Sequence, residues 1–340
     1  MTEAVEESGL LEVEGLEVVY HTDEQPLTAL HDVTFSVRPR EIVGIVGESG
    51  CGKSTLSAAL MGLLPPNGEV TAGRIAYRTQ DVLQLRPEDF RHLRGSELAM
   101  IFQDPLSSLN PTFAIGAQMR DVLRAHGGRG DRRRIATILE RVGIPDAQDR
   151  LGDYPHQFSG GMRQRIMIAM ALMLEPALII ADEVTSALDV TLEAQILELL
   201  RELRDERGTA VLFISHDLGV VAQVCDRVVV MYAGRTVEEA NVYALFEQPL
   251  HPYTEALLAA VPSRTRRGER LASIPGRVPS LSGLPRGCKF VDRCPYAQPV
   301  NREREPRWLE LDGRRVRCNM YDRESGYEGV RSVDSDPARA

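Results

Sequence analysis

The segment Gly47-Glu48-Ser49-Gly50-Cys51-Gly52-Lys53-Ser54-Thr55 constrains the fold of this 340-residue chain more than any other. It matches the pattern G-x-x-x-x-G-K-[ST], follows the apolar run EIVGIVG (residues 41–47) and precedes the helix-compatible run TLSAALMGLL (residues 55–64). A strand, a glycine-rich turn and a helix start in this order point successive N–H groups at phosphate oxygens. The segment, called the phosphate loop below, therefore predicts an α/β fold that binds a nucleoside triphosphate.

The pattern assigns roles to individual residues of the phosphate loop. Lys53 is expected to reach the β- and γ-phosphates, and Ser54 is expected to ligate Mg²⁺. The other expected nucleotide contacts are Gly47, Ser49, Gly50, Cys51, Gly52 and Thr55. A glycine-rich turn without function is the alternative, and the coincidence of strand, loop, lysine and hydroxyl argues against it.

Two carboxylates follow a second apolar run, ALIIAD (residues 177–182). Asp182 ends this run, where an acidic residue facing the phosphate loop would hold the magnesium ion. Glu183 comes next and is placed to polarise the attacking water as a general base. Acidic residues that merely end a strand are the alternative, which the phosphate loop disfavours.

Hydrophobic patterning predicts the arrangement of the sheets. The runs at residues 41–47, 177–182 and 210–215 are nearly all apolar, as in parallel strands covered on both faces, so we expect them at the centre of a parallel sheet. Residues 11–20 and 30–39 alternate apolar and polar side chains, which predicts a β-rich, antiparallel entry subdomain. A crossover helix is expected from Asp189 to Gly208, with four leucine or isoleucine residues at helical spacing: Leu192, Ile196, Leu199 and Leu203.

The remaining segments predict a division into two domains. Residues 105–174 lack a strand pattern and are expected to form a helical subdomain. Composition turns rich in Pro, Arg and Gly after Pro249, so residues 1–249 are expected to form the main domain and residues 250–340 a small, loop-rich appendage with a flexible end. The predicted fold is therefore an α/β domain with a mixed central sheet and a C-terminal extension.

Composition and charge exclude several classes of protein. The net charge of −9 argues against a nucleic-acid binder, so we expect no nucleic-acid partner. The longest apolar run, Ile166 to Leu174, is far shorter than the roughly 20 residues that span a bilayer. Since the acidic N-terminus lacks a secretory signal, we expect the chain in the cytoplasm, with any membrane role exerted through partners.

Five motifs together resemble an ABC-transporter ATPase subunit. They are the phosphate loop, FSGGMRQR (residues 158–165), LIIADE (residues 178–183), SALD (residues 186–189) and His216 after the run AVLFIS. Their order and spacing are those of the family, and the resemblance covers nearly the whole chain. It implies a P-loop NTPase of the ABC ATPase type that binds and hydrolyses ATP with Mg²⁺.

The resemblance also implies roles for residues outside the phosphate loop. Ser159, Gly160 and Gly161 would bind the γ-phosphate of ATP held by a second ATPase subunit, and Asp189 would lie at that dimer interface. Gln103 would face magnesium and the membrane partner, His216 would contact the γ-phosphate, and Tyr20 would stack on adenine. Without the resemblance, Gln103 would be interpreted as a surface residue, His216 as a packed core residue and Tyr20 as an ordinary strand residue. The chain departs from the family pattern at two positions: Met162 stands where glutamine is frequent, and Val184 stands where proline commonly follows the catalytic glutamate. We expect both substitutions to be tolerated.

Four segments resemble the ATPase subunits of dipeptide and oligopeptide importers in particular: residues 101–111, 154–172, 251–262 and 274–297. This branch implies as partners two transmembrane permease subunits, an extracytoplasmic solute-binding protein and a second ATPase subunit, with a heterodimer favoured over a homodimer. It implies a peripheral position on the cytoplasmic face of the cell membrane. The motor of a nickel or other small-solute importer, an exporter motor and a soluble ABC ATPase remain alternatives.

In the same branch the C-terminal extension carries four cysteines that resemble an iron–sulfur site. Cys288, Cys294 and Cys318 match three of these positions, and Asn301 stands where the remaining cysteine would align. A [4Fe–4S] cluster with an oxygen or solvent ligand, a zinc site, or three reduced cysteines that pack a small domain all remain open. The last histidine of the chain is His251, so no histidine lies among or after the three cysteines to serve as a nitrogen ligand.

Overall fold

The computed structural model describes residues 9–102, 104, 108–128, 130–186, 189–261 and 274–332. The described residues belong to two compact units, each built from separate stretches of chain. The first unit is drawn from Met1–Leu10, Val37–Ile42 and Tyr77–Ile214. The second unit is drawn from Leu11–Ser36, Val43–Ala76 and Ser215–Ala340.

Three parallel strands form the sheet of the first unit: β6 (Leu98–Ile101), β7 (Leu178–Asp182) and β8 (Ala210–Ser215). Strand β7 lies in the middle, with Leu178 opposite both Leu98 of β6 and Ala210 of β8. Every residue of β7 and β8 is buried, so the prediction of parallel strands covered on both faces is confirmed for these two runs. Helix α8 (Val190–Arg207) makes the predicted crossover between them and buries Ile196, Leu199 and Leu203.

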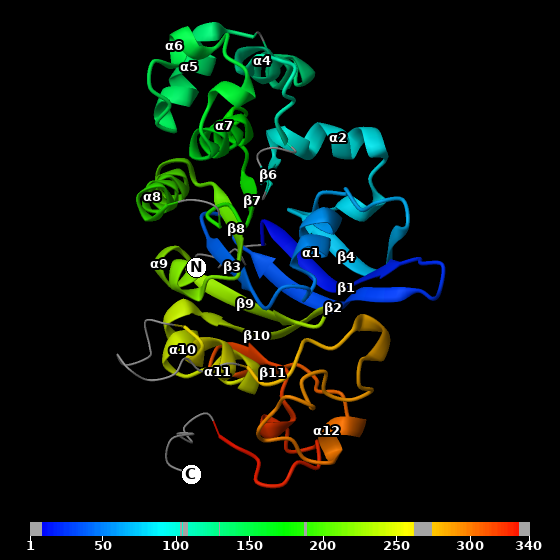
Figure 1. Ribbon diagram of the computed structural model, residues 1–340. Helices are drawn as coiled ribbons and strands as arrows, with labels where there is room; N and C mark the ends of the chain where they lie inside the picture. Colours follow the sequence, from blue (N-terminus) through cyan, green and yellow to red (C-terminus); the bar gives the residue numbers. More distant parts are fainter. Residues whose placement is uncertain are drawn as a thin grey trace, which may run out of the picture. The chain divides into compact units, whose positions relative to one another are not determined.

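Helices make up the rest of the first unit. They are α2 (Pro87–Ser96), α4 (Ile115–Ala125), α5 (Arg132–Arg141), α6 (Ala147–Arg150) and α7 (Gly160–Leu172), and a short strand β5 (Gln80–Asp81) precedes them. Helix α5 packs on α4, α6 and α7, as the green group of helices in Figure 1 shows. Among the described residues between 105 and 174 there is no strand, in agreement with the predicted helical subdomain.

An antiparallel sheet opens the second unit, with strand order β2-β1-β4. Its strands are β1 (Leu11–Tyr20), β2 (Leu27–Val37) and β4 (Gly68–Tyr77). Burial alternates along β1, and the alternation shifts phase at Gly15, whose φ of 58° is a left-handed conformation that favours glycine. The predicted β-rich entry subdomain is therefore confirmed, with one irregularity that moves the inward face.

The second sheet of this unit has the strand order β3-β9-β10-β12-β11. Strand β3 (Ile42–Val46) is parallel to β9 (Arg227–Tyr232), and β9 forms an antiparallel hairpin with β10 (Arg235–Asn241). Strand β12 (Arg314–Val316) pairs with β10, and β11 (Leu309–Leu311) pairs with β12. The helices of this unit are α1 (Lys53–Leu60), α9 (Leu218–Val224), α10 (Val242–Glu247), α11 (Pro252–Ala259) and α12 (Val300–Glu303).

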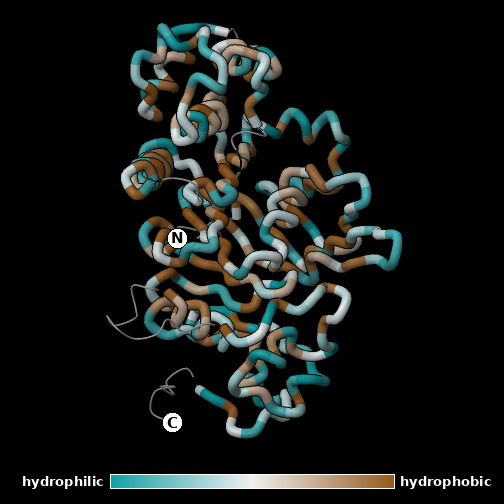
Figure 2. Tube along the Cα trace, in the orientation of Figure 1, coloured by the Kyte–Doolittle hydropathy of each residue, from teal (hydrophilic) through white to brown (hydrophobic). Residues whose placement is uncertain are grey.

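The C-terminal segment 274–332, called the tail below, shares both a sheet and a core with the residues before it. Strand β12 continues the sheet through β10, and Val316, Cys318 and Met320 form a buried cluster with Leu250. Most of the tail is otherwise loop, as the sequence predicts, and Figure 2 shows that many of its residues are hydrophilic. The domain boundary near Pro249 stays a prediction.

Candidate ATP-binding site

The phosphate loop joins β3 to α1 and is closely packed on its inner side. A Cβ at Gly47 would overlap the Met231 carbonyl oxygen and lie 2.7 Å from Cys51 Sγ. Gly52, the residue before α1, has a φ of 106°, and a Cβ there would lie 2.8 Å from Leu30 Cδ2. Glycine is therefore required at both ends of the turn by the surrounding chain itself.

Lys53 directs its ammonium group back across the loop. Its Nζ donates to the carbonyl oxygens of Gly47 at 2.8 Å and Glu48 at 3.3 Å, and the side chain is buried. Ser54, at the start of α1, and Ser49 are exposed. A lysine held across a turn whose outer side is open is the arrangement that binds phosphate groups.

Tyr20 lies beside the last residue of the loop. Its hydroxyl is 3.3 Å from Thr55 Oγ1, and its ring packs on Gly68, where a Cβ would lie 2.8 Å from Tyr20 Cε1. The aromatic ring predicted to stack on adenine is therefore adjacent to the phosphate loop, and the stacking itself stays a prediction.

Cys51 is buried, and burial raises the pKa of its thiol. Its carbonyl oxygen accepts the N–H of Gly234 at 2.9 Å, which ties the loop to the turn between β9 and β10. Cys51 is therefore a packing residue of the loop as well as a predicted nucleotide contact.

His216 follows β8 and is exposed, so it is not the packed core histidine that would be its ordinary role. The next residue, Asp217, caps α9 by accepting the N–H groups of Gly219 and Val220 at 2.7 and 3.3 Å. This cap fixes the backbone directly after His216 and leaves the imidazole on the surface.

The acidic pair lies at the end of β7 in the first unit. Asp182 is buried, and Glu183 is half-buried with a φ of 48°, an uncommon conformation for a residue with a side chain. The Glu183 N–H donates to Ile214 O at 2.9 Å, and Gln164 Nε2 donates to Val184 O at 3.1 Å. Val184 is buried, so valine in place of proline fits the core at this turn.

The predicted γ-phosphate ligands lie at the start of α7. Ser159 caps this helix by accepting the N–H of Met162 at 3.3 Å, and both Ser159 and Gly160 are exposed. A Cβ at Gly160 would meet nothing within 4 Å. The described residues therefore give no steric reason for a glycine at this position.

Asp189 has a local role that sequence reasoning missed. It is exposed and caps α8, because its Oδ1 accepts the N–H groups of Thr191 and Leu192, both at 3.0 Å. An aspartate directly before a predicted helix is the signal that would have indicated this cap. Gln103, the remaining predicted site residue of this part, lies outside the described residues.

The structure thus divides the predicted site residues between the units. The phosphate loop, Tyr20 and His216 belong to the second unit, and Asp182, Glu183, residues 159–161 and Asp189 belong to the first. Sequence reasoning also missed the contacts of Glu48 with Tyr253 and Arg293, which lie more than 200 residues away in the chain.

The three cysteines of the tail line one cavity together with His251 and Asn301. All three are free thiols, and burial raises the pKa of Cys288 to about 11 and raises the pKa of Cys294 and Cys318 as well. Asn301 Oδ1 accepts the N–H of Gln298 at 2.8 Å, so this oxygen already has a structural partner.

The described residues do not fit a metal ion as they stand. They contain no group of three or more His, Cys, Asp or Glu side chains arranged to hold one. Burial, which raises the pKa of each thiol, and the hydrogen bond that Asn301 Oδ1 already accepts agree with that result. Among the described residues, no helix combines the length and the apolar character needed to cross a membrane.

Comparisons with known proteins agree with these features. The family model described as "ABC transporter" matches residues 30–186, and the model described as "Oligopeptide/dipeptide transporter, C-terminal region" matches residues 237–300. Among solved structures, one described as the dimeric, post-hydrolysis state of the ATP-binding cassette MJ0796 bound to ADP and Pi superposes with a TM-score of 0.62 at 25% identity. The match covers 68% of this chain and 98% of that one.

Curated relatives match over more of the chain. The dipeptide transport ATP-binding protein DppD of Escherichia coli (strain K12) is 46% identical over 314 residues, which cover 91% of this chain and 96% of DppD. The oligopeptide transport ATP-binding protein OppD of Salmonella typhimurium is 46% identical over 312 residues, which cover 91% of this chain and 93% of OppD. The chain therefore belongs to the ATP-binding subunits of the ABC-transporter family and carries the family's oligopeptide/dipeptide transporter C-terminal region.

Proposed function

We propose that this ATPase is the motor subunit of an importer for dipeptides or oligopeptides. The observation that carries the proposal is its 46% identity to DppD and OppD over at least 91% of the chain, together with the C-terminal family model that matches residues 237–300. A likeness that extends beyond the ATPase fold into the tail favours this branch over other transporters. The motor of a nickel or other small-solute importer, an exporter motor and a soluble ABC ATPase are the alternatives.

Within this proposal the site residues have different tasks. Lys53 binds the β- and γ-phosphates, with the N–H groups of the loop from Gly47 to Ser54 around them, and Tyr20 stacks on the adenine. Glu183 accepts a proton from the attacking water, and His216 contacts the γ-phosphate. Gln103 would act between the metal and the membrane partner and would link ATP binding to transport. Ser54, Gln103 and Asp182 would hold Mg²⁺, which supplies neutralisation of phosphate charge.

A second ATPase subunit completes the site. Ser159, Gly160 and Gly161 reach the γ-phosphate held by that subunit, and Asp189 lies near the interface. The exposed helix start and the open space at Gly160 support this role, because an N-terminal turn with free approach suits an anion. We favour a heterodimer with a related chain, in which ATP binding closes the two subunits and hydrolysis releases them.

The proposed surroundings follow from the same branch. The subunit pair would lie on the cytoplasmic face of the membrane under two permease subunits, and a solute-binding protein outside the membrane would deliver the peptide. Selectivity would rest with that protein and the permeases, since none of the proposed site residues contacts the solute.

Capture of the tagged chain from gently solubilised native membranes tests the function. Co-purification of two multi-span permeases and a second ATPase subunit, with peptide-stimulated ATP hydrolysis on addition of the binding protein, is the expected result. Stimulation by nickel in place of peptide would move the assignment to the small-solute alternative. Recovery of soluble proteins or nucleic acid alone would overturn the transport role and leave the ATPase.

For the tail we keep three expectations for its cysteines as separate proposals: an iron–sulfur cluster, a zinc site and three reduced thiols. A [4Fe–4S] cluster on Cys288, Cys294 and Cys318 requires the thiols to lose their protons and requires a fourth ligand from outside this set. Three reduced thiols that pack the tail require neither. Iron, labile sulfide and zinc measured after anaerobic purification separate them, since the cluster predicts about four irons per chain and packing predicts no metal.

A further inference from the structure

We infer that Arg293 in the tail is a positioning residue of the ATP site, because it holds Glu48 and thereby the shape of the phosphate loop. The inference rests on the proposed role of this loop in binding ATP. It gives the tail a part in nucleotide binding that is independent of any metal.

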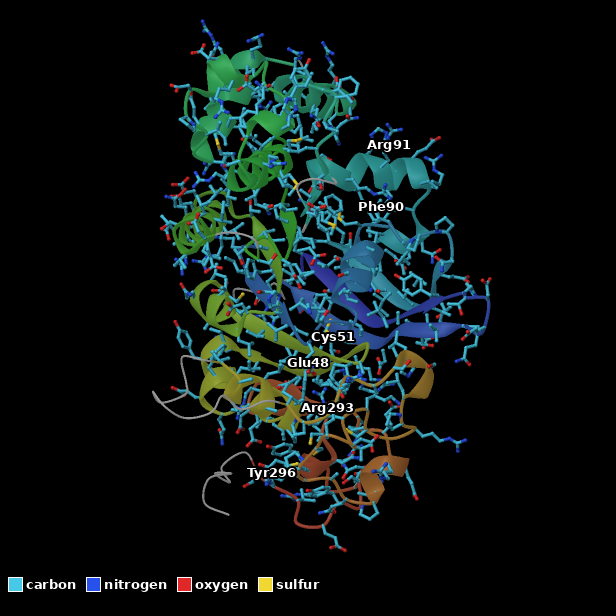
Figure 3. All side chains as sticks on the ribbon, in the orientation of Figure 1. Glu48, Cys51, Phe90, Arg91, Arg293 and Tyr296 are labelled. Atoms are coloured by element: carbon cyan, nitrogen blue, oxygen red, sulfur yellow. The ribbon has the colours of Figure 1, made fainter. Side chains whose placement is uncertain are left out.

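Arg293 and Glu48 form a bidentate ion pair. Arg293 Nη1 lies 2.7 Å from Glu48 Oε2, and Nη2 lies 2.9 Å from Oε1. The Arg293 side chain is 5% exposed and that of Glu48 is 26% exposed, so water screens the pair little. Figure 3 shows the two labelled side chains next to each other, below Cys51. Two parallel, charge-assisted hydrogen bonds fix the direction of the carboxylate as well as its position.

The guanidinium group is itself held from several sides. Arg293 Nε donates to Pro275 O at 2.7 Å, and Nη1 lies 3.4 Å from the Tyr232 hydroxyl. Tyr232 packs against Phe290 and Tyr253, with ring centroids 5.1 and 4.6 Å apart. Arg293 therefore presents a fixed charge to Glu48.

Tyr253 holds the same residue of the loop by its backbone. The Glu48 N–H donates to the Tyr253 hydroxyl at 2.8 Å, and Tyr253 is fully buried on α11. The start of α11 is fixed by the buried carboxylate of Glu238, which accepts the N–H groups of Leu250 and His251 at 2.8 and 2.9 Å. Glu48 thus has a partner for its side chain and another for its backbone, both from outside the loop.

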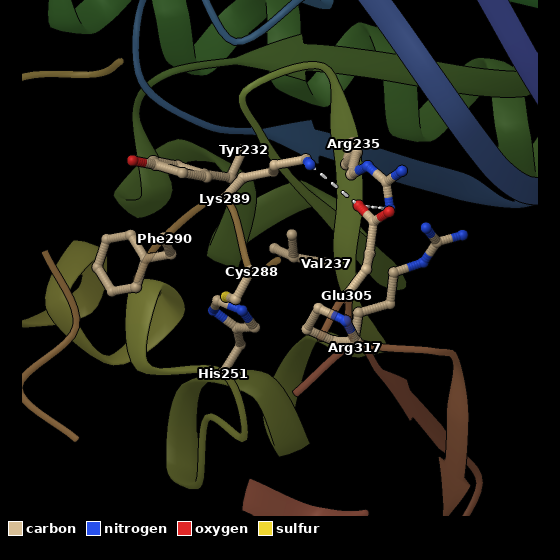
Figure 4. A pocket seen from close by; sticks show the side chains of 10 residues that line it. Tyr232, Arg235, Val237, His251, Cys288, Lys289, Phe290, Glu305 and Arg317 are labelled. Carbon is tan, nitrogen blue, oxygen red and sulfur yellow. Dashed lines mark ion pairs between the residues drawn. The ribbon is translucent and has the colours of Figure 1, made fainter. Parts of the chain in front are cut away.

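A second ion-pair cluster fixes the tail near Arg293. Glu305 lies 2.7 Å from Arg235 Nη1 of β10 and 3.2 Å from Lys289 Nζ, as the dashed lines in Figure 4 show. Phe290 and Tyr232 line the same cavity. The segment from Cys288 to Arg293 is therefore held at both ends. Lys289 is linked to β10 through Glu305, and Arg293 contacts Tyr232 of β9, with the ring of Phe290 packed on Tyr232 between them.

The link to phosphate binding runs through the first two residues of the loop. Lys53 Nζ donates to the carbonyl oxygens of Gly47 and Glu48, so the direction of these carbonyls sets the position of the ammonium group. Without Arg293, the Glu48 carboxylate would have lost its cation and could turn toward Lys53, the nearest positive charge of the loop. The phosphate loop would then hold ATP less well, with the chemical step less affected.

The test compares Arg293→Gln with Arg302→Gln in the full-length protein. Arg302 is the matched control, because it lies in the same tail and pairs with Asp292 at 2.8 Å, with both side chains more than half exposed. We expect Arg293→Gln to raise the Kd for Mg-ATP and the KM for ATP about tenfold, with kcat nearly unchanged. Arg302→Gln is expected to match the wild type, and Arg293→Lys to recover part of the loss.

Two further variants make the result decisive. Glu48→Gln removes one charge on the loop side and is expected to weaken ATP binding in the same direction, which covers the case that Arg293→Gln does not fold. In the double variant the losses should not add, because both changes break one contact. A folded Arg293→Gln protein with wild-type Kd and KM, or equal losses in Arg293→Gln and Arg302→Gln, would overturn the inference.

Lys53→Ala separates this inference from the proposed function. If Lys53→Ala abolishes ATP binding and Arg293→Gln leaves it intact, the loop assignment stands and the role of Arg293 is wrong. If Lys53→Ala still binds ATP normally, the loop assignment fails and the inference fails with it.

Discussion

The phosphate loop and the start of α7 are both glycine-containing turns before a helix, yet their surroundings differ. At Gly47 and Gly52 the chain itself leaves no room for a Cβ, and Lys53 is buried across the turn. At Gly160 there is open space, and the residues on either side of the helix start are exposed or half-buried. The first turn is completed by its own chain, whereas the start of α7 is open, as the proposed contact with a second ATPase subunit requires.

The largest expected effect is that of Glu183→Gln. Removing the general base should lower ATP turnover about 10²–10⁴-fold and leave ATP binding intact. Because ATP would then persist, the protein should accumulate as an ATP-held dimer that uses the start of α7 as its contact. Sedimentation with Mg-ATP, compared with Mg-ADP, measures this. Turnover at the wild-type rate would show that Glu183 is not the base.

Gly160→Ala should separate folding from catalysis. Alanine has a higher helix propensity than glycine and meets no neighbour here, so the unfolding free energy should change by less than about 1 kcal/mol. Turnover of the assembled dimer should fall about 10²-fold, because the added methyl group displaces the approaching phosphate. Thermal melts and steady-state ATPase assays on one preparation give both numbers. Normal turnover would show that nothing approaches Gly160 closely.

Gly47→Ala should have the opposite profile. The added methyl group overlaps the Met231 carbonyl oxygen and crowds Cys51 Sγ, so we expect a loss of about 1–3 kcal/mol in unfolding free energy. Isothermal titration with Mg-ATP should show weakened binding even for the isolated chain. A wild-type melting temperature would mean that the crowding relaxes at no cost.

Substitutions of Asp189 give the smallest expected effect. They distinguish its role as the cap of α8 from its proposed role at the dimer interface. Asp189→Ala removes the cap of α8 and should cost about 1 kcal/mol, whereas Asp189→Asn keeps an acceptor for Thr191 and Leu192 and should cost little. Urea unfolding of both variants measures the cap. If Asp189→Asn lowers turnover of the assembled dimer without a stability loss, the charge acts at the interface.

The sheet was predictable where burial is complete and apolar, and unpredictable where charges are buried. Apart from Asp182 and Ser215 at their ends, strands β7 and β8 carry only apolar residues, so their runs stand out in the sequence. Strand β10 reads Arg-Thr-Val-Glu-Glu-Ala-Asn and resembles a surface segment, yet Arg235 and Glu238 are buried. Glu305, the partner of Arg235, lies far along the chain. The partners of Glu238 are backbone N–H groups at the start of α11, which no side-chain pattern marks.

The candidate site shows the same division. The positions of the phosphate loop, of Asp182 at the end of β7 and of Ser159 before α7 follow from local motifs, since each motif carries its own strand or helix signal. The support of the loop by Arg293 joins residues 245 positions apart and needs the folded tail to appear. Glu48 occupies a position that the loop pattern leaves open, so the pattern cannot indicate that its charge has a partner.

The pairing of β12 with β10 also bears on how the chain tolerates shortening. Val316 faces Glu238 across this pair, so the tail satisfies backbone groups of β10 that would otherwise form a bare sheet edge. A version that stopped near residue 250 would expose that edge together with side chains whose charges have lost their partners. Proteolysis or truncation of the tail should therefore produce self-associating protein instead of a smaller soluble ATPase.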